Sequence, residues 1–212
     1  MQIALINASP KMKDSASSTI LEDLKSFISK SKVETISCEM HKTQISEKQK
    51  EELYQCDALV FIFPLYVDGI PSHLLNNLIS LQKHFNAKAS KPIKVYTIVN
   101  CGFYEGRQNE IAIEIVKNWT YKAGLLWGQG LGIGGGGMLT SIKTVPLGNG
   151  PKKNLGKAFN ELVPNIINGT SGDTLYITPN IPRFIYIAGG NMGWRSQIKT
   201  NGLTAKDLFR QL

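Results

Sequence analysis

The feature of this sequence that most constrains its fold is an uninterrupted apolar run, Ala58 to Phe63, which ends at Pro64. A strand with one face in water alternates apolar and polar residues, whereas a strand covered on both faces can be apolar throughout. The run therefore predicts a central strand with protein packed on both sides. Such strands belong mainly to parallel sheets, whose crossover connections place helices over the two faces.

Strand and helix patterns alternate along the chain around this central run. Further strands are predicted at residues 2–7, 33–37, 93–99 and 125–133. The segments between them, and the segment after the last, have helical patterns. Five strand and helix pairs in succession predict an α/β three-layer sandwich, with a five-stranded parallel sheet in the order 2-1-3-4-5 and helices on both faces. This is the flavodoxin-like fold.

The length and composition favour one domain with an appended tail. The 212 residues, of which 42% are hydrophobic and 19% charged, suffice for a single substantial core. We assign residues 1–170 to a flavodoxin-like domain and residues 171–212 to a C-terminal extension that packs on the domain or on a partner subunit. In the extension a helical pattern runs from Pro182 to Gly202, although three internal glycines weaken it.

Charge and cysteine content limit the classes of partner. The net charge is +8, but the 24 Lys and Arg residues are scattered, which argues against nucleic acid. The three cysteines are too widely spaced for a disulfide framework or a compact metal site, which fits a reducing compartment. No stretch approaches the about 18 apolar residues of a membrane-spanning helix, and a signal peptide is not evident. We therefore expect a cytoplasmic protein without a metal, nucleic-acid or membrane partner.

A candidate anion site lies where the first predicted strand ends. The loop there is rich in hydroxyl and ammonium groups: Ser9, Lys11, Lys13, Ser15, Ser17 and Ser18. A helical pattern follows at once, and we expect its cap at Ser17, Ser18 or Thr19. The first N–H groups of a helix have no internal partner and, with the helix dipole, favour an anion. Because GxxxxGK[ST] is absent, the sequence excludes a P-loop and favours a monophosphate; the alternative is a serine-rich cap without a ligand.

Two further loops meet the first at the same edge of the predicted sheet. In residues 64–70, Tyr66 either lies against a flat ligand or fills the edge of the core. Asp68 contacts a ligand or a partner chain or, as we favour, shapes the turn. Residues 100–106 combine an amide, a glycine and two aromatic rings, which suits the polar edge of a ring system or a plain connecting turn. Cys101 lies in this loop without a histidine base nearby, which argues against a nucleophile.

The motifs of several other protein classes are absent or lack the surrounding sequence that they need. The segment from Gly130 to Gly135 matches GxGxxG, but prolines and turn residues follow it instead of a helix. We expect its glycines to let the backbone approach a ligand, a neighbouring loop or another subunit. The histidines lack metal-ligand spacing and GxSxG is absent, which argues against metal and hydrolase chemistry. A receiver domain needs acids at the ends of strands 1 and 3, where Asn7 and Phe63 stand.

The three loops together resemble the NAD(P)H-dependent FMN reductase and NAD(P)H quinone reductase branch of the flavodoxin-like superfamily, over about residues 1–170. The resemblance is carried by Ser9-Pro10-Lys11 with its trailing serines, by residues 64–71 (Pro-Leu-Tyr-Val-Asp-Gly-Ile-Pro) and by residues 100–105 (Asn-Cys-Gly-Phe-Tyr-Glu). It implies that FMN is bound, with its phosphate at Ser9, Lys11, Ser15, Ser17 and Ser18. It places the isoalloxazine ring between two loops, at Pro64, Leu65, Tyr66, Val67 and Asp68 and at Asn100, Cys101, Gly102 and Tyr104. The family's basic residue is usually Arg, and Lys11 supplies a point charge instead of a bidentate fork.

The resemblance also implies the reaction. We expect an FMN-dependent oxidoreductase in which hydride passes from NAD(P)H through bound FMN to a flavin, a quinone or a similar acceptor. The flavin carries the chemistry, so no catalytic side chain is assigned. The family implies a homodimer or a dimer of dimers, in which Tyr66, residues 134–137 or the tail around Trp194 meet a second chain. The alternatives are a non-enzymatic flavodoxin-like electron carrier, which the positive charge argues against, and a ligand-free regulatory module.

Overall fold

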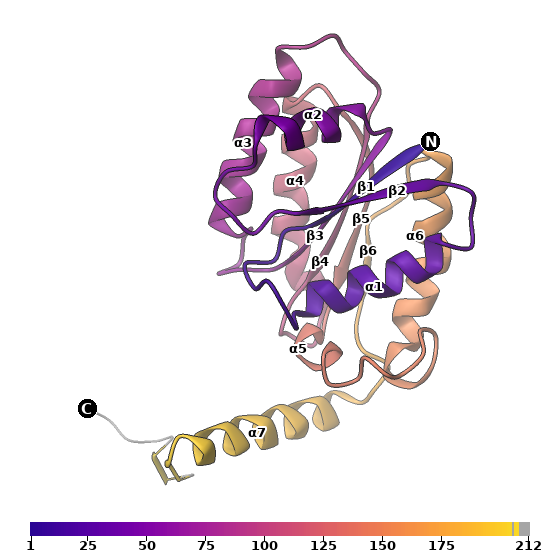
Figure 1. Ribbon diagram of the computed structural model, residues 1–212. Coiled ribbons are helices and arrows are strands. Elements are labelled where there is room, and N and C mark those ends of the chain that lie inside the picture. Colours follow the sequence, from indigo (N-terminus) through magenta and orange to yellow (C-terminus); the bar gives the residue numbers. More distant parts are fainter. Residues whose placement is uncertain (205, 208–212) are drawn as a thin grey trace. The chain divides into compact units, whose positions relative to one another are not determined.

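The computed structural model describes residues 1–204 and 206–207, which form two compact units (Figure 1). The first unit, Met1–Pro179, contains a parallel sheet, and the second begins at Asn180. The sheet has six strands in the order β2-β1-β3-β4-β5-β6. They are β1 (Gln2–Asn7), β2 (Glu34–Glu39), β3 (Ala58–Pro64), β4 (Lys94–Asn100), β5 (Leu126–Ile133) and β6 (Leu175–Ile177).

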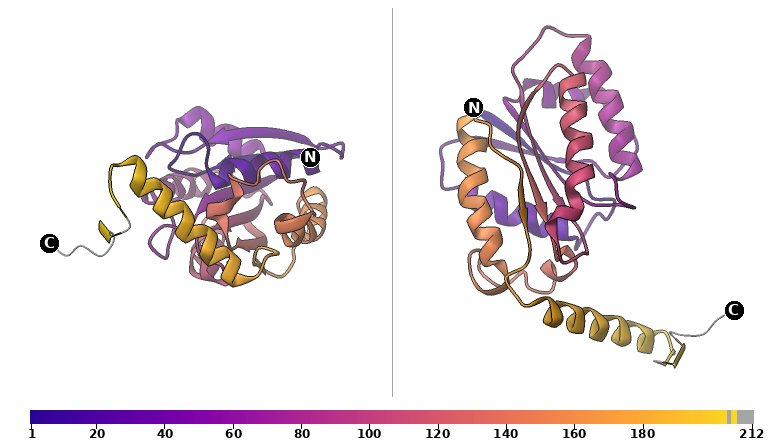
Figure 2. Two further views of the ribbon diagram at one scale, coloured as in Figure 1. Left: turned by 90° about the horizontal axis from the view of Figure 1, so that it is seen from below. Right: turned by 180° about the vertical axis from the view of Figure 1, so that it is seen from behind.

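Helices cover both faces of this sheet (Figure 2). They are α1 (Ala16–Ile28), α2 (Glu47–Gln55), α3 (Ser72–Asn86), α4 (Glu110–Lys122), the short α5 (Gly136–Leu139) and α6 (Lys153–Asn168). Apolar residues of α1 and α6 pack on one face, and those of α2, α3 and α4 pack on the other. Short 3₁₀ helices, Gly106–Asn109 and Gly150–Lys152, precede α4 and α6. The predicted three-layer α/β sandwich is therefore confirmed.

The apolar run in β3 is the centre of both cores. All six of its residues have no exposed surface. Leu59, Phe61 and Phe63 face the core under α2, α3 and α4, and the residues between them face the core under α1 and α6. The rings of Phe61 and Trp119 pack in a T-shaped arrangement with 5.6 Å between their centroids. This strand confirms the expectation of burial on both faces.

The prediction of five strands is wrong, because the chain adds a sixth parallel strand, β6, at the edge beside β5. Leu131 pairs with Leu175 and Ile133 pairs with Ile177, and Gly134 N–H donates to the Ile177 carbonyl at 2.9 Å. Three residues are too few for a periodic pattern to be recognised in the sequence. The strand depends on the hydrogen bonds that β5 offers, and these are not visible in local sequence.

A charged pair is buried between α1 and the start of α6. The Lys152 side chain is 1% exposed, and its Nζ lies 2.6 Å from Oδ2 of Asp23, whose side chain is 18% exposed. Both residues lie beside the apolar core formed with α1 and α6. The carboxylate compensates the lysine charge at a place that water barely reaches.

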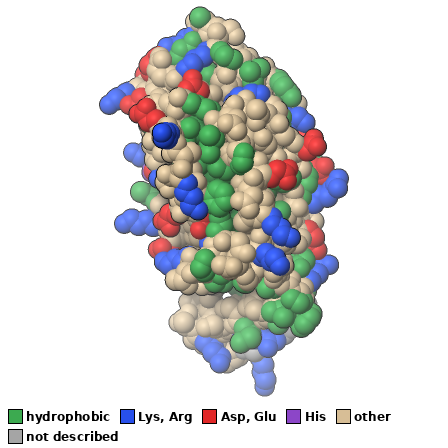
Figure 3. Space-filling model, turned by 90° about the vertical axis from the view of Figure 1, so that its right-hand side faces the viewer, with side chains coloured by type: hydrophobic (Ala, Val, Ile, Leu, Met, Phe, Trp, Pro, Cys, Tyr) green, Lys and Arg blue, Asp and Glu red, His purple; other side chains and the backbone are tan. Residues whose placement is uncertain are grey.

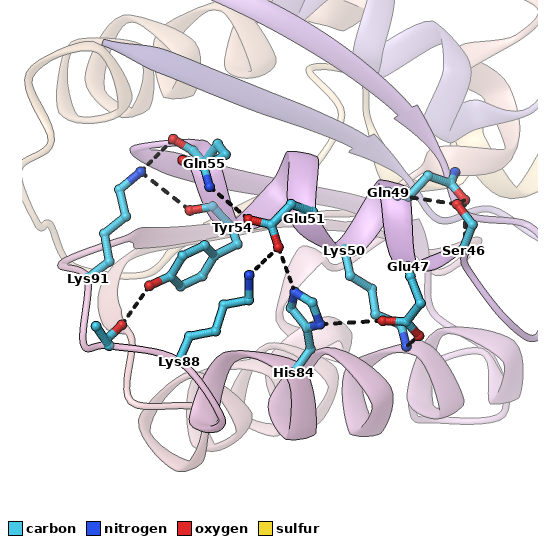
Figure 4. Close-up of polar contacts among 11 residues, drawn as sticks. Ser46, Glu47, Gln49, Lys50, Glu51, Tyr54, Gln55, His84, Lys88 and Lys91 are labelled. Carbon is cyan, nitrogen blue, oxygen red and sulfur yellow. Dashed lines mark hydrogen bonds and ion pairs between the residues drawn. The ribbon is translucent and has the colours of Figure 1, made fainter.

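Polar contacts hold α2 against α3 on the other face of the sheet (Figure 4). His84 of α3 lies between two glutamates of α2, with Nδ1 3.6 Å from Glu47 and Nε2 3.4 Å from Glu51. Lys88 also pairs with Glu51. The helix α2 begins with a capping box between Ser46 and Gln49.

The second unit contains the helix α7 (Arg183–Thr200), which Pro182 precedes as the predicted first residue of the pattern. None of its residues is buried, and Phe184, Met192 and Trp194 are each more than half exposed. Across the described residues, every helix is too short or too polar to cross a bilayer.

Charged side chains of both signs are interspersed on the face drawn in Figure 3. Lysine and arginine do not form one continuous patch there. On this face, positive charge is therefore dispersed rather than concentrated.

Candidate functional site

The loop after β1 is held by its own hydrogen bonds. Asn7, the last residue of β1, accepts the Ser9 N–H on Oδ1 at 3.2 Å. Ser9 is buried, and its Oγ accepts the Lys11 N–H at 3.2 Å. The Lys11 ammonium donates to the Asp14 carbonyl at 2.9 Å. Ser9 therefore faces into the loop, while the exposed Lys11 closes it from outside.

The helix α1 begins at Ala16, earlier than the predicted caps imply, because a different serine caps it. Ser15, with an extended backbone, accepts the Ser18 N–H on Oγ at 3.0 Å, so the expected cap at Ser17, Ser18 or Thr19 is wrong. The Ser15 and Ser18 hydroxyls also lie 2.8 Å apart. Among the described residues, the N–H groups of Ala16 and Ser17 have no protein acceptor. They are the free donors of the helix N-terminus.

The loop after β3 is a tight turn in a strained conformation. Tyr66 and Gly69 exchange both backbone hydrogen bonds, at 3.0 and 3.1 Å. Val67 and Asp68 between them have φ of 47° and 57°, the left-handed pair of a type I′ turn. Asp68 tolerates this conformation, but a β-branched valine rarely adopts it. The turn leaves Tyr66 56% exposed and Val67 94% exposed, whereas Pro64 and Leu65 before it are half-buried.

Asn100, at the end of β4, joins all three loops. Its Nδ2 donates to the Ser17 hydroxyl at 2.9 Å and to the Phe63 carbonyl at 3.1 Å. Its backbone carbonyl accepts the Leu65 N–H at 2.7 Å. Asn100 is 3% exposed, so these bonds are shielded from water. The sequence predicts that the three loops converge, and the structure places them together.

The rest of the loop after β4 is partly buried and partly exposed. Cys101 is 4% exposed and its Sγ accepts from Asn109 Nδ2 at 3.4 Å. Burial raises the pKa of this thiol, which keeps it protonated at neutral pH and argues against a nucleophile. Gly102 is exposed, Phe103 is 52% exposed and Tyr104 is half-buried.

The glycine-rich segment after β5 supports this loop. Gly135 N–H donates to the Phe103 carbonyl at 2.6 Å, and Gly136 N–H donates to the Cys101 carbonyl at 2.7 Å. A Cβ at Gly134 would lie 2.1 Å from the Tyr104 carbonyl oxygen. The sequence left three alternatives open for these glycines. The structure shows one of them, the close approach of the backbone to a neighbouring loop.

Two residues that the sequence reasoning did not assign to the site also build it. Asn7 holds the first loop, as described above, and is 3% exposed. His73 of α3 is 7% exposed, and its Nε2 lies 3.2 Å from the Ala8 carbonyl oxygen of the same loop. Burial lowers the pKa of His73, so it supports the loop as a neutral ring. Asn7 could have been identified from the sequence, because it is a polar residue at the end of a buried strand. No feature of the sequence indicated that His73 contacts the site.

The exposed large apolar side chains of the three loops lie at this edge of the sheet. Met12, Tyr66, Val67 and Phe103 are each more than half exposed. A group of exposed apolar side chains beside polar donors is typical of a surface that binds a ligand or a partner. A cavity of about 420 Å³ lies between β2 and α2, and its lining includes Glu39 at the end of β2.

No family model matches the chain, and no curated protein sequence matches it. Solved structures do. A NAD(P)H:quinone oxidoreductase from Methanothermobacter marburgensis is 16% identical with a TM-score of 0.54, over 68% of this chain and 91% of that one. A short-chain flavodoxin associated with a non-canonical PDU bacterial microcompartment is 12% identical with a TM-score of 0.55, over 81% and 100%. RosB with bound 8-demethyl-8-formylriboflavin-5′-phosphate is 9% identical with a TM-score of 0.52, over 76% and 81%.

At these identities the similarity establishes the fold. The chain has the flavodoxin-like fold that the sequence predicts, with an added sixth strand. The neighbours include an NADPH-quinone reductase and a NAD(P)H:quinone oxidoreductase. A shared fold does not by itself assign an activity.

Proposed function

We propose that the chain binds FMN at the edge where β1, β3 and β4 end, and that it is a flavin-dependent oxidoreductase. Hydride would pass from NAD(P)H through the flavin to a flavin, a quinone or a similar acceptor. The observation that carries the proposal is the set of Asn100 hydrogen bonds, which hold the three loops together at one place. Ligands of open α/β sheets bind at this edge.

The hydroxyl groups of the first loop fit a phosphate. Ser9 Oγ accepts from Lys11 N–H and Ser17 Oγ accepts from Asn100, so each hydroxyl proton remains available for an anion. Of the two protons on Ser15 and Ser18, only one is used in their mutual bond. The free N–H groups at the start of α1 and the Lys11 ammonium add positive potential.

The second and third loops fit a flat ring. Tyr66 and Val67 on one side, with Phe103 and the exposed Gly102 on the other, offer apolar surface and a backbone without a side chain. Apolar contact of this kind covers a ring face, while polar backbone groups bind its edge. Asp68 serves the turn conformation, as its φ of 57° supports. Flavin bound here would supply the hydride chemistry, and the chain would supply orientation.

A flavodoxin-like electron carrier is the second candidate, because the short-chain flavodoxin is among the structural neighbours. Carriers of this fold are usually acidic, and the charge of +8 argues against docking to a basic partner. Catalytic oxidation of NAD(P)H distinguishes an oxidoreductase from an electron carrier.

We further propose a homodimer in which the tail around Trp194 or the turn at Tyr66 meets the second chain.

The test begins with the absorption spectrum of the purified protein, before and after incubation with FMN. Flavin bands that remain with the protein after desalting support the proposal. Oxidation of NADH or NADPH is then followed with added quinone or free FMN. Ser17→Ala should weaken FMN binding about tenfold, since a hydrogen bond to a charged group contributes about 1.5 kcal/mol.

The matched control is Ser26→Ala, which removes an exposed hydroxyl from the same helix. It should leave FMN affinity unchanged. If FMN binds but no acceptor supports turnover, the carrier is the better account. If neither FMN nor riboflavin binds, the proposed function is wrong.

A further inference from the structure

One carboxylate is tied into the proposed phosphate site. Asn7 Nδ2 donates to Oε2 of Glu39 at 3.0 Å and to the Ser18 hydroxyl oxygen at 3.3 Å. Because one nitrogen makes both contacts, the Glu39 carboxylate and the Ser18 hydroxyl are no farther apart than the sum of these two distances. Glu39 is the last residue of β2, and Asn7 is its register partner at the end of β1.

The negative charge of Glu39 opposes the binding of an anion, which the rest of the site favours. The first turn of α1 contains no acidic residue, and its free N–H groups favour an anion. Lys11 and Lys13 lie in the same loop. A glutamine at position 39 would make the same hydrogen bond to Asn7 without a charge. The carboxylate therefore adds repulsion between its own charge and a phosphate, which the hydrogen-bond network does not require.

We propose that Glu39 limits how tightly the site holds the phosphate, so that FMN is a dissociable ligand that exchanges with solution rather than a permanently bound group. The inference rests on the proposed function, because it concerns the same phosphate site. It also bears on selectivity, since the carboxylate reduces the preference of the site for FMN over riboflavin, which has no phosphate.

The test compares Glu39→Gln with the native chain by flavin fluorescence titration at low salt. The variant should bind FMN about 3- to 10-fold more tightly, the gain expected from removing one like charge at the surface of the protein. Its affinity for riboflavin should change less than about twofold, because riboflavin has no phosphate. The gain for FMN should shrink at high salt, which screens exposed charges.

Glu34→Gln is the matched control. It makes the same charge change at the other end of β2, where Glu34 pairs in register with Gln2. FMN affinity should be unchanged in this variant. An equal gain in Glu34→Gln means that only net charge matters, and this result overturns the role of Glu39.

Two further results would also overturn the proposal. Equal or weaker FMN binding by Glu39→Gln means that the carboxylate only positions Asn7. An equal gain for FMN and riboflavin means that the effect is not on the phosphate. Failure of both the native chain and the variant to bind either flavin is a distinct outcome, which refutes the proposed function itself.

Discussion

The buried pair between Lys152 and Asp23 allows a quantitative prediction for stability. Asp23→Asn keeps the shape of the side chain but leaves the lysine charge without compensation. Exposed pairs contribute about 0–1 kcal/mol, whereas removing one partner of a buried pair costs about 3–5 kcal/mol. With Lys152 only 1% exposed and Asp23 18% exposed, the pair belongs near the lower end of the second range. We expect Asp23→Asn to lower the free energy of unfolding by about 3 kcal/mol.

The assay is chemical denaturation followed by the fluorescence of the largely buried Trp119. Glu114→Gln is the control, because it breaks the more exposed pair with Lys117, at 3.3 Å, and should cost less than about 1 kcal/mol. A second variant, Asp23→Leu with Lys152→Met, removes both charges and should recover most of the loss. A cost below about 1 kcal/mol for Asp23→Asn would refute the argument that the pair is desolvated.

Three further predictions follow from the loops. Val67→Asn should raise the free energy of unfolding by about 1 kcal/mol, because asparagine tolerates the left-handed conformation; an unchanged or lower value in denaturant titrations counts against strain. Gly134→Ala should cost at least about 1–3 kcal/mol and reduce FMN affinity, since its Cβ would meet the Tyr104 carbonyl at 2.1 Å; a native-like melting curve contradicts this. The lowered pKa of His73 means that the unfolded state binds the proton more readily, so its stability contribution is complete above pH 6.5 and is lost as pH falls below that value. This loss should be absent in His73→Gln. If the free energy of unfolding depends on pH in the same way in both chains, His73 is not the cause of the loss.

Features determined by local sequence were predictable. The apolar run in β3 requires burial on both faces. The helix cap at Ser15 was missed because neighbouring serines have the same capping chemistry, and the backbone conformation decides among them. The strand β6 was missed because its pairing with β5 is a tertiary contact.

The candidate site was predictable in position more than in detail. The three loops had to meet because parallel strands end at one edge. The resemblance placed Asn100 beside a ligand's ring, and the composition of its loop equally suited a plain turn; in the structure both Nδ2 hydrogens bind the chain itself. The interactions of Asn7 and His73 depend on residues distant in sequence. Such partners are set by packing, which no local pattern records.

The bonds made by Asn100 have a consequence for the rate at which a ligand enters. Because one buried carboxamide already fastens Ser17, Phe63 and the neighbouring turn, the loops are assembled when the chain folds. Ligand binding then does not have to order the loops, so the entropic cost of ordering them does not weaken binding. A ligand meets a preorganised surface, so association should follow a single fast phase whose rate constant increases in proportion to ligand concentration.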